Sequence, residues 1–316
     1  MLDLKHYLGI DLGGTNVAIG LVSAEGTLLH KDSVPTDSHR GYQAVVADMI
    51  ALCKKVAADS GFTMADIASI GIGSPGHCDN ARGVIVFASN IGFYDVPICD
   101  LFHAAFGIPI YLNNDANCAA LGESVSGAAK DAPSSVTITL GTGVGGGIII
   151  DGKIMSGAFG GGGEVGHMSI CFDGEPCPCG GRGCWEAYAS ATGLIRQAKI
   201  AAIYHPTSLL ATQYDLRQLN GKAVFDAADA GDQVAQDVID KYLRYVAIGL
   251  ANVINILQPD TIVLGGGISA QGDKILRPIE ALTRKEIFGS FYTKFVTATL
   301  GNDAGIIGAA MLGMDS

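Results

Sequence analysis

The chain has 316 residues, 44 of them glycine, and its 31 Asp and Glu side chains outnumber 20 Lys and Arg, giving a net charge of −11. An acidic surface repels phosphodiester backbones, so nucleic acid is not an expected partner. The sequence contains no run of about 18 apolar residues that could span a bilayer, and no basic and then apolar leader opens it. We therefore expect a cytoplasmic protein without membrane contact.

The first part of the chain predicts a meander of three short strands, followed by alternating helices and strands. Glycine-containing turns join the strands, and the first helix shows apolar residues at helical spacing. The strands are expected at 7–11, 16–23, 27–34, 67–73 and 108–112, and the helices at 43–60 and 116–129.

The opening pattern returns in the middle of the chain. Strands are expected at 135–140, 144–150 and 153–155, and Asp151-Gly152 is a strong hairpin signal. This duplication of architecture indicates an α/β protein with two similar lobes that face each other across a cleft.

We place a small N-terminal lobe at 1–118, completed by 300–316, and a large lobe at 119–299. Segment 201–223 carries no motif and is expected to be a surface helix–loop insertion. The remaining elements are helices at 232–257 and 304–312 and strands at 261–264 and 295–300.

Three glycine-rich turns that each follow an apolar strand suit the binding of nucleotide phosphates, because backbone N–H groups can approach an oxygen where no Cβ intervenes. Any one alone is more often a structural turn, and none is a Walker A loop. Three turns on repeated lobes favour ATP, and the carboxylate beside the first turn suits Mg²⁺ held through water. The residues expected to bind Mg-ATP are Asp11, Gly13, Gly14, Thr15, Gly141, Thr142, Gly143, Gly265, Gly266 and Gly267.

Asp115 follows the strand expected at 108–112, at the carboxyl end where ligands bind in α/β sheets. An equal alternative is a structural role as the N-cap of the next helix. Phosphoryl transfer to an alcohol needs a group that takes the hydroxyl proton, which an Asp can do. Asn114 can donate and accept hydrogen bonds with a polyol, so the pair favours a sugar substrate.

Cysteines 177, 179 and 184 give the spacing C-x-C-x4-C, with His167 ten residues before the first. Three thiolates and one imidazole form a complete tetrahedral set for a structural Zn²⁺. Free thiols that cluster by chance are the alternative, and Cys171 lies outside the pattern. With four protein ligands the zinc has no open position, so its expected role is to fix the loop that carries Glu164 and Glu186.

Together these motifs resemble the ROK family of bacterial sugar kinases and repressors over nearly the whole chain. The resemblance rests on 11–15, 71–76, 113–117, 140–147, 163–167 and 177–186, and the last two are the most specific. It implies an actin-like (ribonuclease-H-like) two-domain ATPase fold, Asp115 as the catalytic base and a homodimer. One nitrogen of His167 would bind zinc and the other the sugar. The sugar-binding positions it implies are Asn90, Asn114, Asp115, Glu164, His167 and Glu186.

Within the family, 186–190 most resembles the glucokinases, which implies transfer from Mg-ATP to glucose to give glucose 6-phosphate. Kinases for N-acetylmannosamine, fructose and allose share the motifs, so the hexose stays open, as does polyphosphate or ADP as the donor. A non-catalytic sugar-sensing regulator is the alternative from another class. The family's repressors carry an N-terminal helix-turn-helix, for which the residues before Asp11 leave no room, and an intact Asp115 also favours an enzyme.

Overall fold

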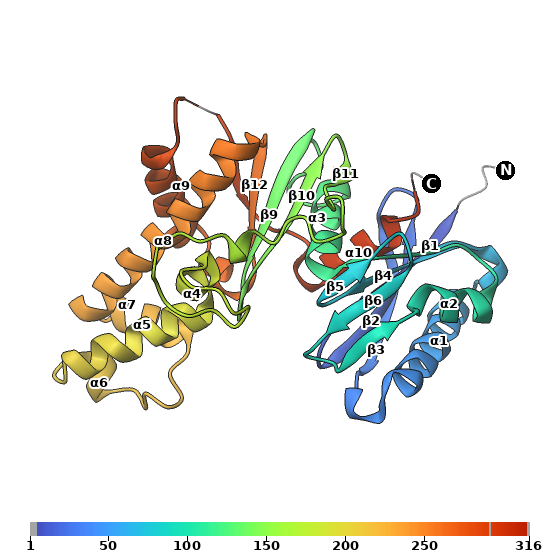
Figure 1. Ribbon diagram of the computed structural model, residues 1–316, viewed down its shortest axis with the longest axis horizontal. Helices are drawn as coiled ribbons and strands as arrows, with labels where there is room; N and C mark the ends of the chain where they lie inside the picture. Colours follow the sequence, from blue (N-terminus) through green and yellow to red (C-terminus); the bar gives the residue numbers. More distant parts are fainter. Residues whose placement is uncertain (1–4, 291, 315–316) are drawn as a thin grey trace. The chain divides into compact units, whose positions relative to one another are not determined.

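The computed structural model describes residues 5–290 and 292–314 and divides into two compact units (Figure 1). The first unit comprises Met1–Thr137, Gly147–Gly163 and Ala298–Ser316, and the second comprises Ile138–Gly146 and Glu164–Thr297. The lobe boundaries expected at residues 118 and 299 stay a prediction. Among the described residues, no helix is long and apolar enough to cross a membrane.

A five-stranded sheet in the order β3-β2-β1-β4-β8 forms the centre of the first unit. The first three strands are an antiparallel meander, as the sequence predicts, while β1 runs parallel to β4, and β4 parallel to β8. The bounds are β1 His6–Leu12, β2 Asn16–Ser23, β3 Leu28–Pro35, β4 Ile67–Ser74 and β8 Ile110–Asn114, all within two residues of the predicted strands.

Helices cover both faces of this sheet because its strands are apolar on both sides. Leu8 and Ile10 belong to one buried cluster, with the apolar faces of α1 (Tyr42–Asp59) and α2 (Ile98–Phe106). Tyr7, the residue before Leu8 on β1, packs in a second cluster with α3 (Asp115–Val125) and α10 (Ala304–Met311). Gly71 lets α10 lie directly on the sheet, because a Cβ there would overlap the carbonyl oxygen of Ala309.

A small antiparallel sheet, in the order β5-β6-β7, lies between β4 and α2 in the sequence and was not expected. Its strands β5 (His77–Asp79), β6 (Val84–Ala88) and β7 (Phe93–Val96) have three to five residues, which is too short to show a clear alternation. The sheet adds Ile85, Phe93 and Val96 to the main buried cluster and places Asn90 in the turn between β6 and β7.

The second sheet has the order β11-β10-β9-β12-β13, which repeats the first sheet strand for strand. The predicted duplication of architecture is therefore confirmed. The division between the two units passes through β9 and β10. The bounds are β9 Ser134–Leu140, β10 Val144–Ile150, β11 Lys153–Ile154, β12 Thr261–Gly265 and β13 Lys294–Thr297.

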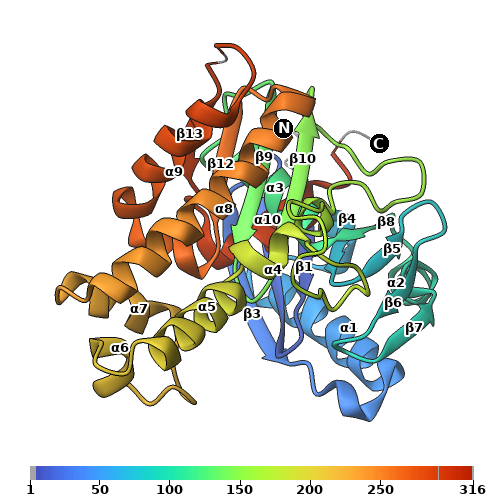
Figure 2. The ribbon, with the colours of Figure 1, turned by 60° about the vertical axis from the view of Figure 1, so that its left-hand side comes forward.

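The remaining helices belong to the second unit, in which α4, α5 and α8 lie side by side (Figure 2). The helix α8 is the predicted one; Asp232 caps its first turn by accepting the N–H of Val234 at 3.0 Å. The segment 201–223 comprises the end of α5, α6, a loop and the start of α7, and it is anchored in the unit by Leu210, which is fully buried, and Leu219, which is 7% exposed. The bounds are α4 Trp185–Ala189, α5 Ala191–Tyr204, α6 Leu209–Thr212, α7 Gly221–Asp229, α8 Gln233–Leu257 and α9 Asp273–Glu286, with the 3₁₀ turns η3 Val165–His167 and η4 Gly267–Gln271. The 3₁₀ turns η1 Ser38–Arg40, η2 Met64–Asp66 and η5 Gly301–Asp303 belong to the first unit.

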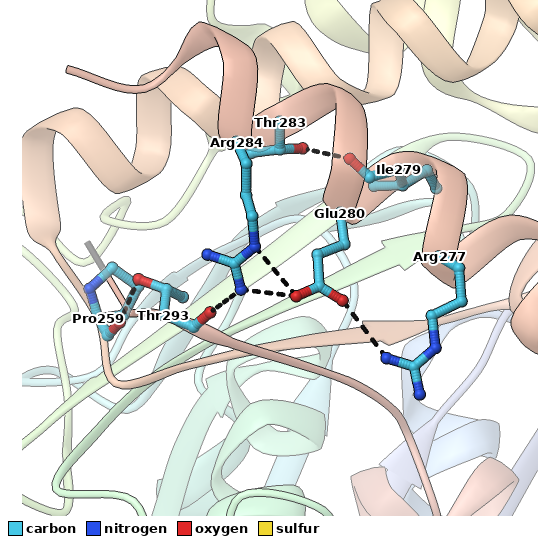
Figure 3. Close-up of polar contacts among 7 residues, drawn as sticks. All are labelled: Pro259, Arg277, Ile279, Glu280, Thr283, Arg284 and Thr293. Carbon is cyan, nitrogen blue, oxygen red and sulfur yellow. Dashed lines mark hydrogen bonds and ion pairs between the residues drawn. The ribbon is translucent and has the colours of Figure 1, made fainter. Parts of the chain in front are cut away.

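A polar network ties α9 to the chain that leads into β13 (Figure 3). The guanidinium of Arg284 donates to Glu280 at 2.6 Å and to the carbonyl of Thr293 at 3.3 Å. The Thr293 hydroxyl in turn donates to the carbonyl of Pro259 at 2.8 Å, just before β12. These hydrogen bonds hold α9 against the residues that lead into β12 and β13, the last two strands of the second sheet.

Candidate functional site

Three neighbouring parallel strands bring the predicted carboxylates of the first unit to one sheet edge. Asp11 is the penultimate residue of β1, and its partner on β4 is Gly73. The next residue of β4, Ser74, pairs with Asn114 at the end of β8, and Asp115 follows at the start of α3. Because the carboxyl ends of parallel strands meet at the same edge, Asp11 and Asp115 lie close enough to interact electrostatically.

The environment of Asp11 disfavours its negative charge. Burial and, to a smaller extent, the charge of Asp115 raise its pKa from 3.8 to about 6. Gly305 of α10 closes over the carboxylate, since a Cβ on that glycine would stand 3.0 Å from Asp11 Oδ2. A cation beside the pair would relieve this repulsion, so the pair is a suitable place for a hard divalent ion.

Asn114, rather than Asp115, is the N-cap of α3. Its Oδ1 accepts the N–H groups of Ala116 at 2.9 Å and Asn117 at 3.4 Å, and its Nδ2 donates to the carbonyl of Gly76 at 3.1 Å. The alternative that Asp115 serves as the cap is therefore wrong. Asp115 is the first residue of the helix and accepts the N–H of Ala116 at 2.8 Å through Oδ1.

The first glycine turn, between β1 and β2, is closed by hydrogen bonds to Gly13. Its N–H donates to the carbonyl of Asn16 at 3.0 Å, and its carbonyl accepts the Thr36 hydroxyl at 2.7 Å. Gly14 and Thr15 are exposed at the tip. Asn90 approaches this tip, with its Nδ2 3.5 Å from where a Cβ on Gly14 would stand. The structure thus brings an exposed amide side chain to a turn whose backbone is open to a ligand.

The other two glycine turns meet in the second unit. In Gly141–Gly143 the first N–H donates to the last carbonyl at 3.0 Å, and the carbonyl of Thr142 accepts the Thr192 hydroxyl at 2.8 Å. Gly266 has a φ of 84°, and a Cβ there would stand 2.5 Å from the carbonyl oxygen of Leu140. The turn 265–267 therefore lies against the turn 141–143, and only glycine permits this approach.

His167, Cys177, Cys179 and Cys184 form the expected cluster, with their ligand atoms all within 4.8 Å of one another. The loop is shaped by bonds from the N–H of Cys177 to the carbonyl of Gly181 and from the N–H of Gly180 to the carbonyl of Cys177. A backbone hydrogen bond from Gly181 lowers the pKa of Cys179, which favours its thiolate. Cys171 lies outside the cluster.

The spacing of the ligand atoms matches a tetrahedral zinc ion. The Sγ atoms of Cys179 and Cys184 are 3.6 Å apart, and Cys177 Sγ is 3.7 Å from His167 Nδ1. Zn–S bonds of about 2.3 Å and Zn–N bonds of about 2.1 Å imply tetrahedral edges of about 3.6–3.8 Å. Three sulfurs and one nitrogen complete a tetrahedral set and leave no open position on the metal, so the donor set fits a structural zinc site.

The imidazole of His167 lies between the cluster and Glu164. Its Nδ1 faces Cys177, and its Nε2 is 3.9 Å from Glu164 Oε2. The carboxylate of Glu186, in the first turn of α4, lies 3.9 Å from Cys177 Sγ. Three of the predicted sugar-binding side chains therefore surround the cluster, and Glu164 and His167 are exposed.

One contact of this region carried no signal in the sequence. Glu186 Oε2 accepts the N–H of Val144 at 3.0 Å, which anchors the carboxylate to the glycine turn at Gly141–Gly143. A partner 42 residues away follows no local pattern. The structure thus groups Asp11, Asn90, Asn114 and Asp115 with the first glycine turn in the first unit, and the metal cluster with Glu164, Glu186 and the other two turns in the second.

Known proteins resemble this chain over its whole length. The glucokinase of Halalkalibacterium halodurans is 39% identical over 98% of this chain and 94% of its own. A crystal structure of a ROK family glucokinase from Streptomyces griseus with glucose and AMPPNP is 35% identical over 99% of this chain and all of that chain, with a TM-score of 0.79. A crystal structure of a ROK hexokinase from Thermus thermophilus is 34% identical over 97% of each chain, with a TM-score of 0.85.

Regulators also occur among the relatives. The xylose repressor of Bacillus spizizenii is 28% identical over 97% of this chain, which spans 76% of the repressor. The mixed α/β fold with its two mixed sheets matches the ROK glucokinase structures and is the predicted actin-like ATPase fold. The model of the ROK family matches residues 7–316. With that match and with relatives above 30% identity over nearly the full length, the chain belongs to the ROK family.

Proposed function

We propose that this protein is an ATP-dependent hexose kinase that converts glucose to glucose 6-phosphate. The observation that carries the proposal is the pair of carboxylates at one sheet edge, Asp11 with a raised pKa and Asp115 at the start of α3. The similarity to glucokinases, one of them bound to glucose and AMPPNP, supports both the activity and the hexose.

In this mechanism Asp115 accepts the proton of the sugar's hydroxymethyl group while that oxygen attacks the γ-phosphorus and the bond to ADP breaks. Asp11 would hold Mg²⁺ through water, and the bound ion would supply positive charge to the phosphates. The exposed glycine turns, with Thr15 and Thr142, donate hydrogen bonds to phosphate oxygens. The sugar hydroxyls are held by Asn90, Asn114, Asp115, Glu164, His167 and Glu186.

The zinc ion has a structural role in this proposal. His167 and the three cysteines of the cluster would hold it, and α4 begins directly after Cys184. With the ion bound, these residues would fix the positions of two groups that bind the sugar, Nε2 of His167 and the carboxylate of Glu186. A homodimer is proposed on the family resemblance, and light scattering of the purified protein tests it.

The Asp115→Asn variant tests the mechanism. It should bind glucose as the parent does and lose about 10²–10⁴-fold in kcat, because the amide cannot take the hydroxyl proton. Asp131→Asn, an exposed position of the same unit, is the matched control and should keep full activity. A variant at Asp115 with parental kcat would remove this residue from the role of base.

A substrate panel tests the hexose. Mg-ATP-dependent ADP release is measured with glucose, mannose, fructose, allose, N-acetylglucosamine and N-acetylmannosamine. We expect the highest kcat/KM with glucose, while a higher value with an N-acetylated sugar would keep the mechanism and change the substrate.

A non-catalytic sugar-sensing regulator is the second candidate, and the similarity to xylose repressors favours it. This candidate predicts glucose binding by calorimetry with no ADP release for any sugar of the panel. Zinc-loaded, folded protein is needed for this comparison, since loss of the metal would weaken glucose binding under either function.

A further inference from the structure

The second unit holds a pocket that the proposed reaction does not use. It has a volume of about 400 Å³ and is lined mainly by residues of α5 and of the first half of α8. That volume is within the range of small-molecule sites, about 300–1,000 Å³. None of the predicted sugar, nucleotide or metal residues lines it.

One wall of the pocket is apolar and aromatic. The rings of Tyr188 and Tyr245 lie 4.6 Å apart at an interplanar angle of 37°, and Val238 lies beside them on α8. Ile200 lines the pocket from α5 and is 44% exposed. An aromatic platform next to branched aliphatic side chains suits a flat, apolar ring.

The charged groups of the pocket suit a ligand that carries both an anionic group and a hydrogen-bond donor. The ammonium of Lys241 lies 5.8 Å from the Tyr245 ring centre, and no carboxylate pairs with it among the described residues. Gln197 Nε2 donates to the carbonyls of Tyr188 and Gly193, both at 3.0 Å, which fixes the orientation of its amide. Its Oε1 is consequently an acceptor; it is buried and lacks a partner in the described chain. This oxygen is closed to solvent, so a ligand in the pocket does not reach it.

The charges of the lining balance each other. Arg196 is engaged by Glu175 at 2.7 Å, which leaves Lys241 as the available cation and Asp237 as an exposed carboxylate. A dianionic sugar phosphate would meet one available cation and a repulsive carboxylate. A zwitterion places its carboxylate near Lys241 and offers its ammonium group to the exposed carboxylate of Asp237. We propose that this pocket binds a small aromatic zwitterion, with the chemistry of a free aromatic amino acid.

The pocket is linked by hydrogen bonds to the segment that carries the metal cluster. The Tyr188 hydroxyl accepts the N–H of Glu175 at 2.7 Å, and the Glu175 carbonyl accepts the N–H of Gly183 at 2.8 Å. Glu175 lies two residues before Cys177, and Tyr188 two residues after Glu186. An occupant that moves either pocket residue changes the position of groups that bind the sugar. This regulatory consequence rests on the proposed function, whereas binding to the pocket does not.

Isothermal titration of the zinc-loaded full chain with L-phenylalanine tests the binding. We expect saturable binding with a Kd below about 1 mM, and an affinity at least about tenfold lower in Lys241→Gln. Lys285→Gln, an exposed lysine of α9 away from the pocket, is the matched control and should bind as the parent does. Phenylalanine amide, which lacks the carboxylate, and 3-phenylpropionate, which lacks the ammonium, should each bind more weakly.

Three outcomes would overturn the proposal. They are no heat of binding up to about 10 mM phenylalanine, unchanged affinity in Lys241→Gln, or stronger Lys241-dependent binding of glucose 6-phosphate than of phenylalanine. The regulatory link is tested separately by the KM for glucose at saturating phenylalanine, which should change at least about twofold in the parent and not in Lys241→Gln. An unchanged KM and kcat would overturn the link. If no phosphoryl transfer occurs at all, the proposed function fails. The titration still shows whether the pocket binds phenylalanine.

Discussion

Replacing Asp11 by asparagine should stabilise the first unit while it abolishes phosphoryl transfer. Burial and the charge of Asp115 raise the pKa of Asp11 from 3.8 to about 6, so the folded protein disfavours the charged form. One pKa unit corresponds to about 1.36 kcal/mol, which gives a penalty of about 3 kcal/mol in the free energy of unfolding at pH 7.5. The asparagine keeps the shape of the side chain and removes the charge.

The sign of this effect follows from the direction of the pKa shift. Below the unfolded pKa of Asp11 both states hold the proton, and the penalty is absent. The penalty grows as the pH rises from about 4 to 6 and is constant above that range. The stability gap between variant and parent should therefore fall from about 3 kcal/mol at pH 7.5 to about 1.5 kcal/mol at pH 5.

Urea unfolding followed by two signals separates the two units. Trp185 is the chain's only tryptophan and belongs to the second unit, so its fluorescence should report an unchanged midpoint. Far-UV circular dichroism includes the first unit and should show the increase. Asp131→Asn is the control for removal of one exposed charge. A variant less stable than its parent at pH 7.5, or a gap that does not change with pH, would refute the reasoning.

Three further predictions concern the metal loop and the packing of helices. Cys179→Ser should lower the zinc content, the Tm and the affinity for glucose, measured by metal analysis, calorimetry and titration, whereas Cys171→Ser should change none of them. Glu123→Gln should cost about 1–3 kcal/mol in urea unfolding, because this buried carboxylate accepts backbone N–H groups with both oxygens and an amide cannot. Gly249→Ala should cost about 1–3 kcal/mol and alter the fluorescence of Trp185, because the new Cβ would overlap the indole ring; a variant with the parental spectrum and stability would contradict this packing.

Local patterns predicted the framework of the fold well. The strands at 16–23 and 144–150 have the bounds that the sequence indicates, because each is an apolar run that starts at a glycine turn. The metal cluster was also predictable, since C-x-C-x4-C with a nearby histidine has few other uses in a reduced protein. In both cases the information lies within about ten residues of the chain.

Features that depend on distant partners could not be predicted. The carboxylate of Glu123 accepts the N–H groups of Thr299 and Leu300, which follow it by more than 170 residues. These hydrogen bonds hold the segment just before α10 in place. The cap of α3 also differs from expectation, since Asn114 is the better placed acceptor at the end of β8 and Asp115 already has helical geometry. Neither the partner of Glu123 nor the cap of α3 can be assigned from residue type alone. The partner depends on which distant segment lies beside α3, and the cap depends on the residue at which β8 ends.

The distribution of cysteines makes the folded protein selective toward thiol reagents. Cys53, Cys78 and Cys118 are buried and Cys99 is half-buried, and burial raises the pKa of both Cys78 and Cys99 to about 12, so these thiols are almost entirely protonated at pH 7.5. Zinc bound by the cluster would protect its three cysteines. Cys171 is exposed and stands outside it. A maleimide dye on the zinc-loaded protein is therefore directed to Cys171, a ready-made attachment point for a reporter beside the metal loop.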